Sequence, residues 1–291
     1  MDFKSVTFRT RDGLSLYYRD YDRAPPGLAP VLCLHGLTRN SADFSAIAEH
    51  LAPRRRVVAP DMRGRGRSAR DPVAAHYNPG VYVEDVWELL AHAGLDRLVV
   101  IGTSMGGMMA MMMAASRPAV LAGVVLNDIG PQIEEQGIRR ISGFVGRTAS
   151  APDWARAAAA IRVMNQAFYP DFTEADWLAM ARRTFREQDG VIRPDYDPAI
   201  GDVVRAGAAV PADMWSLYEA LGPIPTLVVR GRLSDVLSAQ TVAEMTARKP
   251  GLEVLEVANR GHTPVLDEPA CLAAIDDFLT RQDDSAPPPR R

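Results

Sequence analysis

The segment that most constrains the fold is residues 98–115, where an apolar stretch leads into Gly102-Thr103-Ser104-Met105-Gly106. Residues 98–101 are Leu-Val-Val-Ile, without the alternation of a half-solvated strand, which predicts a strand buried on both faces. Residues 108–115 predict a helix. A strand and a helix joined by G-x-S-x-G need a sharp turn at the serine, and glycines on each side avoid backbone collisions. We therefore expect the Ser104 hydroxyl above a sheet edge, at a helix N-terminus that favours negative charge.

Strands and helices are predicted to alternate along most of the chain. An Asp-Gly pair between residues 6–9 and 14–18 indicates a hairpin, and apolar runs at 31–34, 56–60, 123–127, 226–230 and 252–257 indicate further strands. This alternation predicts an α/β fold with a mostly parallel, doubly wound sheet, in which ligands gather at the strands' C-terminal ends. Polar residues follow separate apolar runs at such ends: His35, Asp61, Ser104, Asp128, Asp235 and His262.

The pattern changes between residues 130 and 222. Helix-favouring segments replace the apolar strands there, at about 133–144, 153–168, 174–188 and 212–221. We predict a core formed by residues 1–129 and 223–282 and a helical insertion at 130–222. Residues 283–291 contain three consecutive prolines and are predicted to form a disordered tail. Five aromatic residues of the insertion could line a pocket or simply pack it onto the core: Trp154, Phe168, Trp177, Trp215 and Tyr218.

Composition argues against several classes of partner and site. The net charge of −3 over 291 residues gives no reason to expect nucleic acid or an anionic membrane. No apolar stretch is long enough to span a membrane and no signal segment is recognisable, so we expect a cytoplasmic protein.

Cys33 and Cys271 are expected as buried free thiols. The arginine-rich turn at 61–68 lacks the P-loop pattern and is expected to be structural. We predict no metal and no cofactor, and the sequence does not indicate an oligomeric state.

A serine can act as a nucleophile only if a base takes its proton and a third group orients that base. His262 is the best candidate base because it follows a predicted strand. The other histidines lie in helical or surface stretches or beside a turn glycine: His35, His50, His76 and His92. Two carboxylates that follow strands remain as candidates for the orienting acid, Asp128 and Asp235.

From about residue 5 to residue 280 the chain resembles the α/β-hydrolase superfamily. The resemblance is carried by Leu34-His35-Gly36 and by the segments 61–68, 102–107, 231–235 and 261–262. It implies a catalytic triad of Ser104, Asp235 and His262, in that chain order, with Asp128 as the rival acid. It also implies an oxyanion hole formed by the backbone N–H groups of Leu37 and Met105, and it makes the insertion at 130–222 a cap over the site.

The resemblance further implies a carboxylesterase-like serine hydrolase. A serine at this turn argues against the branches that resemble haloalkane dehalogenases and epoxide hydrolases. The residues after His262 lack the aromatic and polar pair usual in carbon–carbon bond hydrolases. We therefore expect a small-molecule ester or lactone as substrate, cleaved through an acyl-enzyme. The alternatives are a carbon–carbon bond hydrolase, a cofactor-free haloperoxidase-like enzyme, or a non-catalytic ligand receptor on the same fold.

Overall fold

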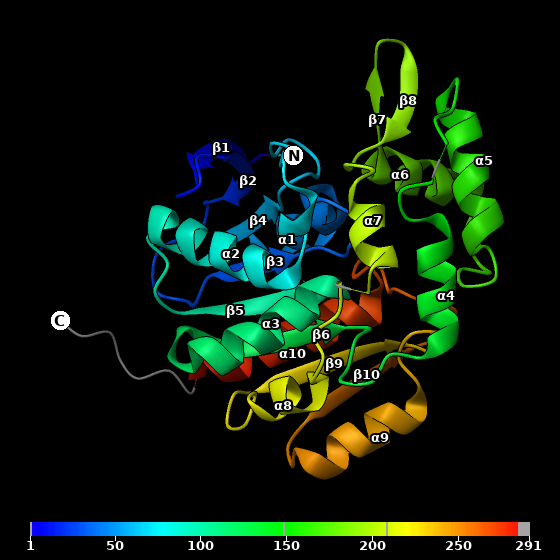
Figure 1. Ribbon diagram of the computed structural model, residues 1–291. Helices are drawn as coiled ribbons and strands as arrows, with labels where there is room; N and C mark the ends of the chain where they lie inside the picture. The colour runs from blue at the N-terminus through cyan, green and yellow to red at the C-terminus, as the bar shows by residue number, and fades with distance from the viewer. Residues whose placement is uncertain (1, 148, 208, 285–291) are drawn as a thin grey trace.

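The fold is built around an eight-stranded sheet in the order β1-β2-β4-β3-β5-β6-β9-β10 (Figure 1). The structure, a computed structural model, describes residues 2–147, 149–207 and 209–284. The strands are β1 (Lys4–Arg9), β2 (Ser15–Tyr21), β3 (Val31–Leu34), β4 (Val57–Asp61), β5 (Leu98–Thr103), β6 (Leu121–Asn127), β9 (Thr226–Gly231) and β10 (Glu253–Val257). Strand β2 runs antiparallel to β1 and β4, and the remaining pairs are parallel. The predicted mostly parallel sheet is confirmed.

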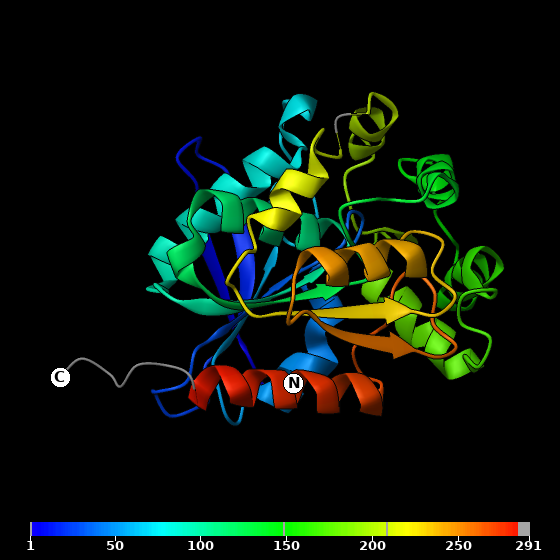
Figure 2. The same ribbon diagram turned by 90° about the horizontal axis from the view of Figure 1, so that it is seen from below.

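Helices cover both faces of the sheet, as Figure 2 shows from below. One face carries α1 (Ser45–Leu51) and α10 (Pro269–Asp284), and the other carries α2 (Pro79–Ala93), α3 (Met105–Ser116), α8 (Met214–Glu219) and α9 (Ala239–Arg248). Short 3-10 turns are η1 (Ser41–Phe44), η2 (Ala74–His76) and η3 (Pro118–Val120). Helix α3 is apolar almost all round and therefore needs cover on all sides. It packs against β5 and β6 and beneath α2 and α8.

Most of the insertion gathers beside the sheet, at the right of Figure 1. It contains α4 (Glu135–Phe144), α5 (Trp154–Asn165), α6 (Glu174–Thr184), β7 (Phe185–Gln188), β8 (Val191–Pro194) and α7 (Ile200–Arg205). The prediction of a helix running on to residue 188 is wrong. Helix α6 ends at Thr184, and β7 and β8 form an antiparallel hairpin. Its turn is Asp189-Gly190, both with left-handed φ, which is a hairpin signal that sequence analysis missed.

The last helix of the predicted insertion belongs with the core packing. Helix α8 lies over α3, and the Tyr218 hydroxyl donates to the Met245 carbonyl oxygen of α9 at 2.9 Å. Helix α8 packs in this position because the apolar surface of α3 would otherwise remain partly exposed to solvent. The predicted limits of the insertion therefore include a helix that completes the core.

The insertion also pairs with the core in its middle, along a contact that we call the seam, formed by residues 64–66 and 195–197. The Gly66 N–H donates to the Asp195 carbonyl oxygen at 3.0 Å, and the Asp197 N–H donates to the Gly64 carbonyl oxygen at 2.7 Å. The Tyr77 hydroxyl donates to Asp197 Oδ2 at 2.7 Å. The insertion is thus also held to the core by backbone hydrogen bonds midway between its two ends.

The C-terminal helix is longer than expected. It continues through residues 283–284, and Asp283 pairs with Arg55 at 2.6 Å, so the tail predicted from residue 283 begins too early. Residues 285–291 lie outside the described residues. Cys33 and Cys271 are buried free thiols, as expected. Within the described part of the chain, no helix combines the length and apolar character needed to cross a membrane.

Candidate active site

Ser104 occupies a strained turn between β5 and α3. Its φ is 52°, which a residue with a side chain rarely adopts. The glycines around it are required by close packing. A Cβ atom on Gly102 would lie 2.4 Å from the Gly106 carbonyl oxygen, and one on Gly106 would lie 2.0 Å from the Leu34 carbonyl oxygen. The glycines therefore allow β5 to approach α3, and α3 to approach β3, on the two sides of the turn that carries the serine.

His262 lies directly beside this serine. The loop after β10 brings His262 Nε2 to 2.9 Å from Ser104 Oγ. The other ring nitrogen, Nδ1, is 2.8 Å from Asp128 Oδ2. An imidazole that donates its Nδ1 proton to a carboxylate has its Nε2 lone pair free to accept the serine proton. The two residues expected to form the nucleophile and base are thus within one hydrogen bond of each other.

The carboxylate that orients His262 in the structure is that of Asp128. Asp128 is fully buried directly after β6 and has a left-handed φ of 56°. Besides His262, its carboxylate accepts hydrogen bonds from the Gly231 N–H at 2.8 Å and from the Ser234 hydroxyl at 2.6 Å. These donors fix both oxygens and hold one of them toward the imidazole.

The prediction that Asp235 contacts His262 is therefore corrected. The Asp235 carboxylate instead forms a bidentate pair with Arg140 of α4, at 2.6 Å to Nε and 2.8 Å to Nη2. Strands β6 and β9 are neighbours in the sheet, so acids after either one can reach the same edge. The turn after β9 directs Ser234 to Asp128 and Asp235 toward the insertion. Sequence analysis did not anticipate Arg140, and no local motif indicates it.

The two residues expected to supply the oxyanion donors belong to the segments beside the cavity and the serine. Leu37 lines the same cavity as Ser104, and Met105 is the first residue of α3. His35 holds the turn before Leu37. Its Nδ1 donates to the Gly36 carbonyl oxygen at 2.7 Å and its Nε2 accepts from the Met62 N–H at 3.0 Å. Burial lowers the pKa of His35 to about 4, so it is neutral and serves this turn. The role of the two N–H groups remains a prediction.

A cavity of about 170 Å³ opens over Ser104 and His262, between the core and the insertion. The five aromatic residues singled out from the sequence do not line it. Trp154, Phe168 and Trp177 pack within the insertion, and Trp215 and Tyr218 pack on the α3 side of the core. Among the described residues, the aromatic side chains that line the cavity are Phe44, Phe144, Tyr169, Phe185 and Tyr196. The alternative considered for these five was that they pack the insertion onto the core. It describes Trp215 and Tyr218, whereas the other three pack mainly within the insertion.

Within the described residues, two buried polar atoms of this cavity have no hydrogen-bond partner, Asn127 Oδ1 and Arg183 Nε. The amide of Asn127 is otherwise fixed, because its Nδ2 donates to Thr103 Oγ1 and to the Pro264 carbonyl oxygen, each at 3.0 Å. Buried polar groups are normally paired, so both atoms are exceptions in the wall of this cavity.

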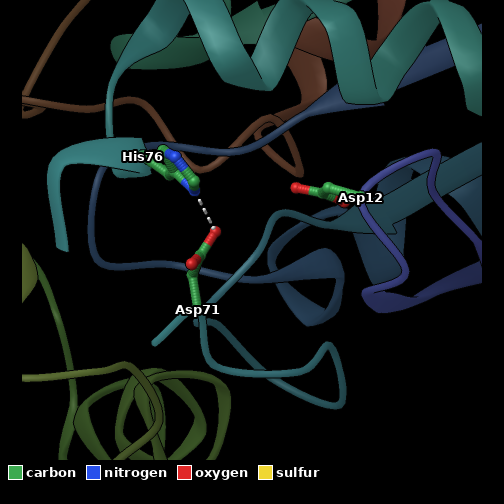
Figure 3. Close-up of side chains that lie close together, drawn as sticks. All are labelled: Asp12, Asp71 and His76. Atoms are coloured by element: carbon green, nitrogen blue, oxygen red, sulfur yellow. Dashed lines mark hydrogen bonds and ion pairs between the residues drawn. The ribbon is translucent and has the colours of Figure 1, made fainter. Parts of the chain in front are cut away.

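Outside the cavity, one cluster of the described residues has side chains that could act as metal ligands. Asp12, Asp71 and His76 lie close together, and His76 Nδ1 is 2.9 Å from Asp71 Oδ2 (Figure 3). However, Arg63 Nη1 donates to both carboxylates, at 2.8 Å to Asp12 Oδ2. The guanidinium already supplies the positive charge, and it would repel a metal cation. Together with the pairing of Arg63 to Asp85, this agrees with a structural role for the turn at 61–68.

Comparisons with known proteins place the chain in a family. Residues 29–269 match the family described as "alpha/beta hydrolase fold". The chain is 33% identical over 274 residues to a 3-hydroxybutyrate-oligomer hydrolase of Cupriavidus necator, covering 91% of this chain and 92% of the relative. It is 26% identical over 250 residues to a 2-(acetamidomethylene)succinate hydrolase of Mesorhizobium japonicum, covering 86% and 87%. A crystal structure of an alpha/beta hydrolase from Novosphingobium aromaticivorans superposes with a TM-score of 0.92 at 42% identity, covering 96% of this chain and 98% of that one. The chain therefore belongs to the alpha/beta hydrolase family.

Proposed function

We propose that the protein is a serine hydrolase that cleaves carboxylic esters through an acyl-enzyme. The observation that carries the proposal is the hydrogen-bonded chain from Ser104 Oγ through His262 to the buried carboxylate of Asp128. A hydroxyl, an imidazole and a carboxylate in this order form the arrangement that activates serine for acyl transfer.

In this mechanism Ser104 Oγ attacks the ester carbonyl while His262 Nε2 takes the hydroxyl proton. Asp128 stabilises the imidazolium that results. The N–H groups of Leu37 and Met105 donate to the developing oxyanion, and each such donor typically contributes about 3–4 kcal/mol to transition-state stabilisation. The imidazolium then protonates the departing alcohol oxygen. Water, deprotonated by His262, attacks the acyl-enzyme and releases the acid and Ser104.

The cavity favours small or medium acyl groups. It is small, about 170 Å³, and largely lined by apolar and aromatic side chains. The relative from Cupriavidus necator is named for oligomers of 3-hydroxybutyrate, which are short-chain oligoesters. We therefore infer a short oligoester or another ester of a small acid as the substrate class.

A fluorophosphonate probe tests the nucleophile. It should label the wild-type protein at Ser104, and Ser104→Ala should lose labelling and at least about 10⁴-fold in kcat on p-nitrophenyl butyrate. Ser116→Ala, at the exposed end of the same helix, is the matched control and should keep both. Labelling at another residue, or an alanine variant that still turns over, would contradict the proposed function.

A further inference from the structure

In the described part of the chain, three arginines line the cavity, and two of them are neutralised by partners. Arg39 Nε donates to Asp43 Oδ2 at 2.6 Å, and Arg140 makes its bidentate pair with Asp235. Arg183 differs from both. None of the described carboxylates lies within 4.0 Å of its guanidinium nitrogens, and none of the described residues is hydrogen-bonded to its side chain. Asp176 and Asp267 act on its charge only from beyond that distance.

Arg183 is nevertheless held in place. It occupies the last turn of α6, where the helix C-terminus favours a cation. Its backbone carbonyl accepts from Asn40 Nδ2 of the core at 3.2 Å. The side chain is half-buried and its Nε is fully buried. The guanidinium of an arginine at a helix C-terminus is usually solvated. Here Nε of Arg183 is buried instead, in the wall of the cavity that contains Ser104 and His262.

We propose that Arg183 binds a free carboxylate of the substrate, so that the preferred esters carry an acid group on the acyl chain or at the end of an oligoester. This inference rests on the proposed function and names its substrate class. A guanidinium presents N–H groups side by side, which match the two oxygens of one carboxylate. Such a carboxylate would neutralise the charge that none of the described carboxylates pairs at close range. Neutral esters of the same size would leave that charge unpaired.

A pair of matched substrates tests this. p-Nitrophenyl hydrogen adipate carries the carboxylate, and p-nitrophenyl methyl adipate has the same chain without the charge. Only cleavage of the nitrophenyl ester is seen by absorbance. Arg183→Gln removes the charge, and Arg183→Lys keeps it but loses the paired donors. Arg182→Gln is the matched control, because Arg182 is exposed, stacks on Trp154 and does not line the cavity.

The wild type should prefer the acid substrate, and Arg183→Gln should lose about 10- to 100-fold in kcat/KM on it, mainly through KM. The same variant should change kcat/KM on the methyl ester by about twofold or less. Arg183→Lys should recover part of the loss, and Arg182→Gln should leave both substrates unchanged. Equal losses on both substrates, or no loss on the acid, would overturn the inference.

Calorimetric titration with adipate separates this inference from the proposed function. If the wild type cleaves neither ester, the ester-hydrolase proposal fails, and binding alone then decides the role of Arg183. Adipate that binds the wild type but binds Arg183→Gln at least about tenfold more weakly supports the carboxylate site. Equal binding to both proteins, or no binding to either, refutes it. Circular dichroism on each variant confirms that the fold is retained.

Discussion

Replacing Asp128 by asparagine should disable His262 as a base while leaving the fold in place. The Gly231 N–H is a fixed backbone donor to Asp128 Oδ1, so the asparagine carbonyl oxygen will take that position. The amide nitrogen then faces His262 Nδ1, which must accept instead of donate. The imidazole proton moves to Nε2 and points at the Ser104 oxygen.

The expected loss in kcat is about 10⁴-fold, as for a triad whose imidazole is held in the wrong tautomer. This corresponds to about 5 kcal/mol of transition-state stabilisation. The cost in folding free energy is smaller, about 1–3 kcal/mol, because one buried hydrogen bond is reversed and none of the packing is lost. A typical domain tolerates that change, so the variant should remain folded at 25 °C.

The assay is kcat on p-nitrophenyl butyrate at saturation, with urea unfolding of the same preparations. Asp235→Asn is the matched control, since Asp235 pairs with Arg140 rather than with His262. It should lose less than about tenfold. The reasoning would be refuted by a folded Asp128→Asn variant within tenfold of the wild type, or by the larger loss in Asp235→Asn.

Three further predictions concern the cavity, pH and the serine turn. The kcat/KM on p-nitrophenyl esters should be highest for acyl chains of roughly two to eight carbons and low on palmitate and emulsified triolein; a profile still rising at palmitate would contradict the small cavity. Burial raises the pKa of Asp195 to about 6, so the native state holds a proton that the unfolded chain releases. The stability of the native state should therefore fall as pH rises from about 4 to 6. In thermal unfolding from pH 4 to 8, Asp195→Asn should show a smaller fall in Tm than the wild type. If the Tm of both proteins changed with pH in the same way, the prediction would be wrong. Gly106→Ala forces a Cβ against the Leu34 carbonyl and should lower the free energy of unfolding in urea by about 2–4 kcal/mol. Gly143→Ala, with open space around the new methyl group, should not lower that free energy. Equal effects of the two substitutions would refute the packing argument.

The sequence was sufficient to place Ser104 and His262 near each other because both follow strands of one parallel sheet. The buried apolar run before Ser104 and the glycines around it leave few other local structures. The choice between Asp128 and Asp235 depends instead on how one short turn after β9 is directed. That direction is set by Ser234, Gly231 and the distant Arg140, which are tertiary contacts without a local pattern.

The insertion was predicted less well for related reasons. Most of its helices were expected near their observed positions, but the short helix α7 was not. The hairpin β7–β8 was not expected either, because its strands are short and largely polar. The aromatic lining was also missed. Whether Phe168 or its neighbour Tyr169 faces the cavity depends on the direction of one loop, and periodicity does not report that.

The seam restricts how the insertion could be exchanged in a designed chimaera. A replacement segment joined only at residues 130 and 222 would leave the Gly66 N–H and the Gly64 carbonyl oxygen without backbone partners. Both glycines have left-handed φ, and Tyr77 lies against Gly64, so the turn cannot easily refold around a new surface. A functional replacement therefore has to include a short extended segment that takes the place of residues 195–197. That segment must pair with residues 64–66 in the same register.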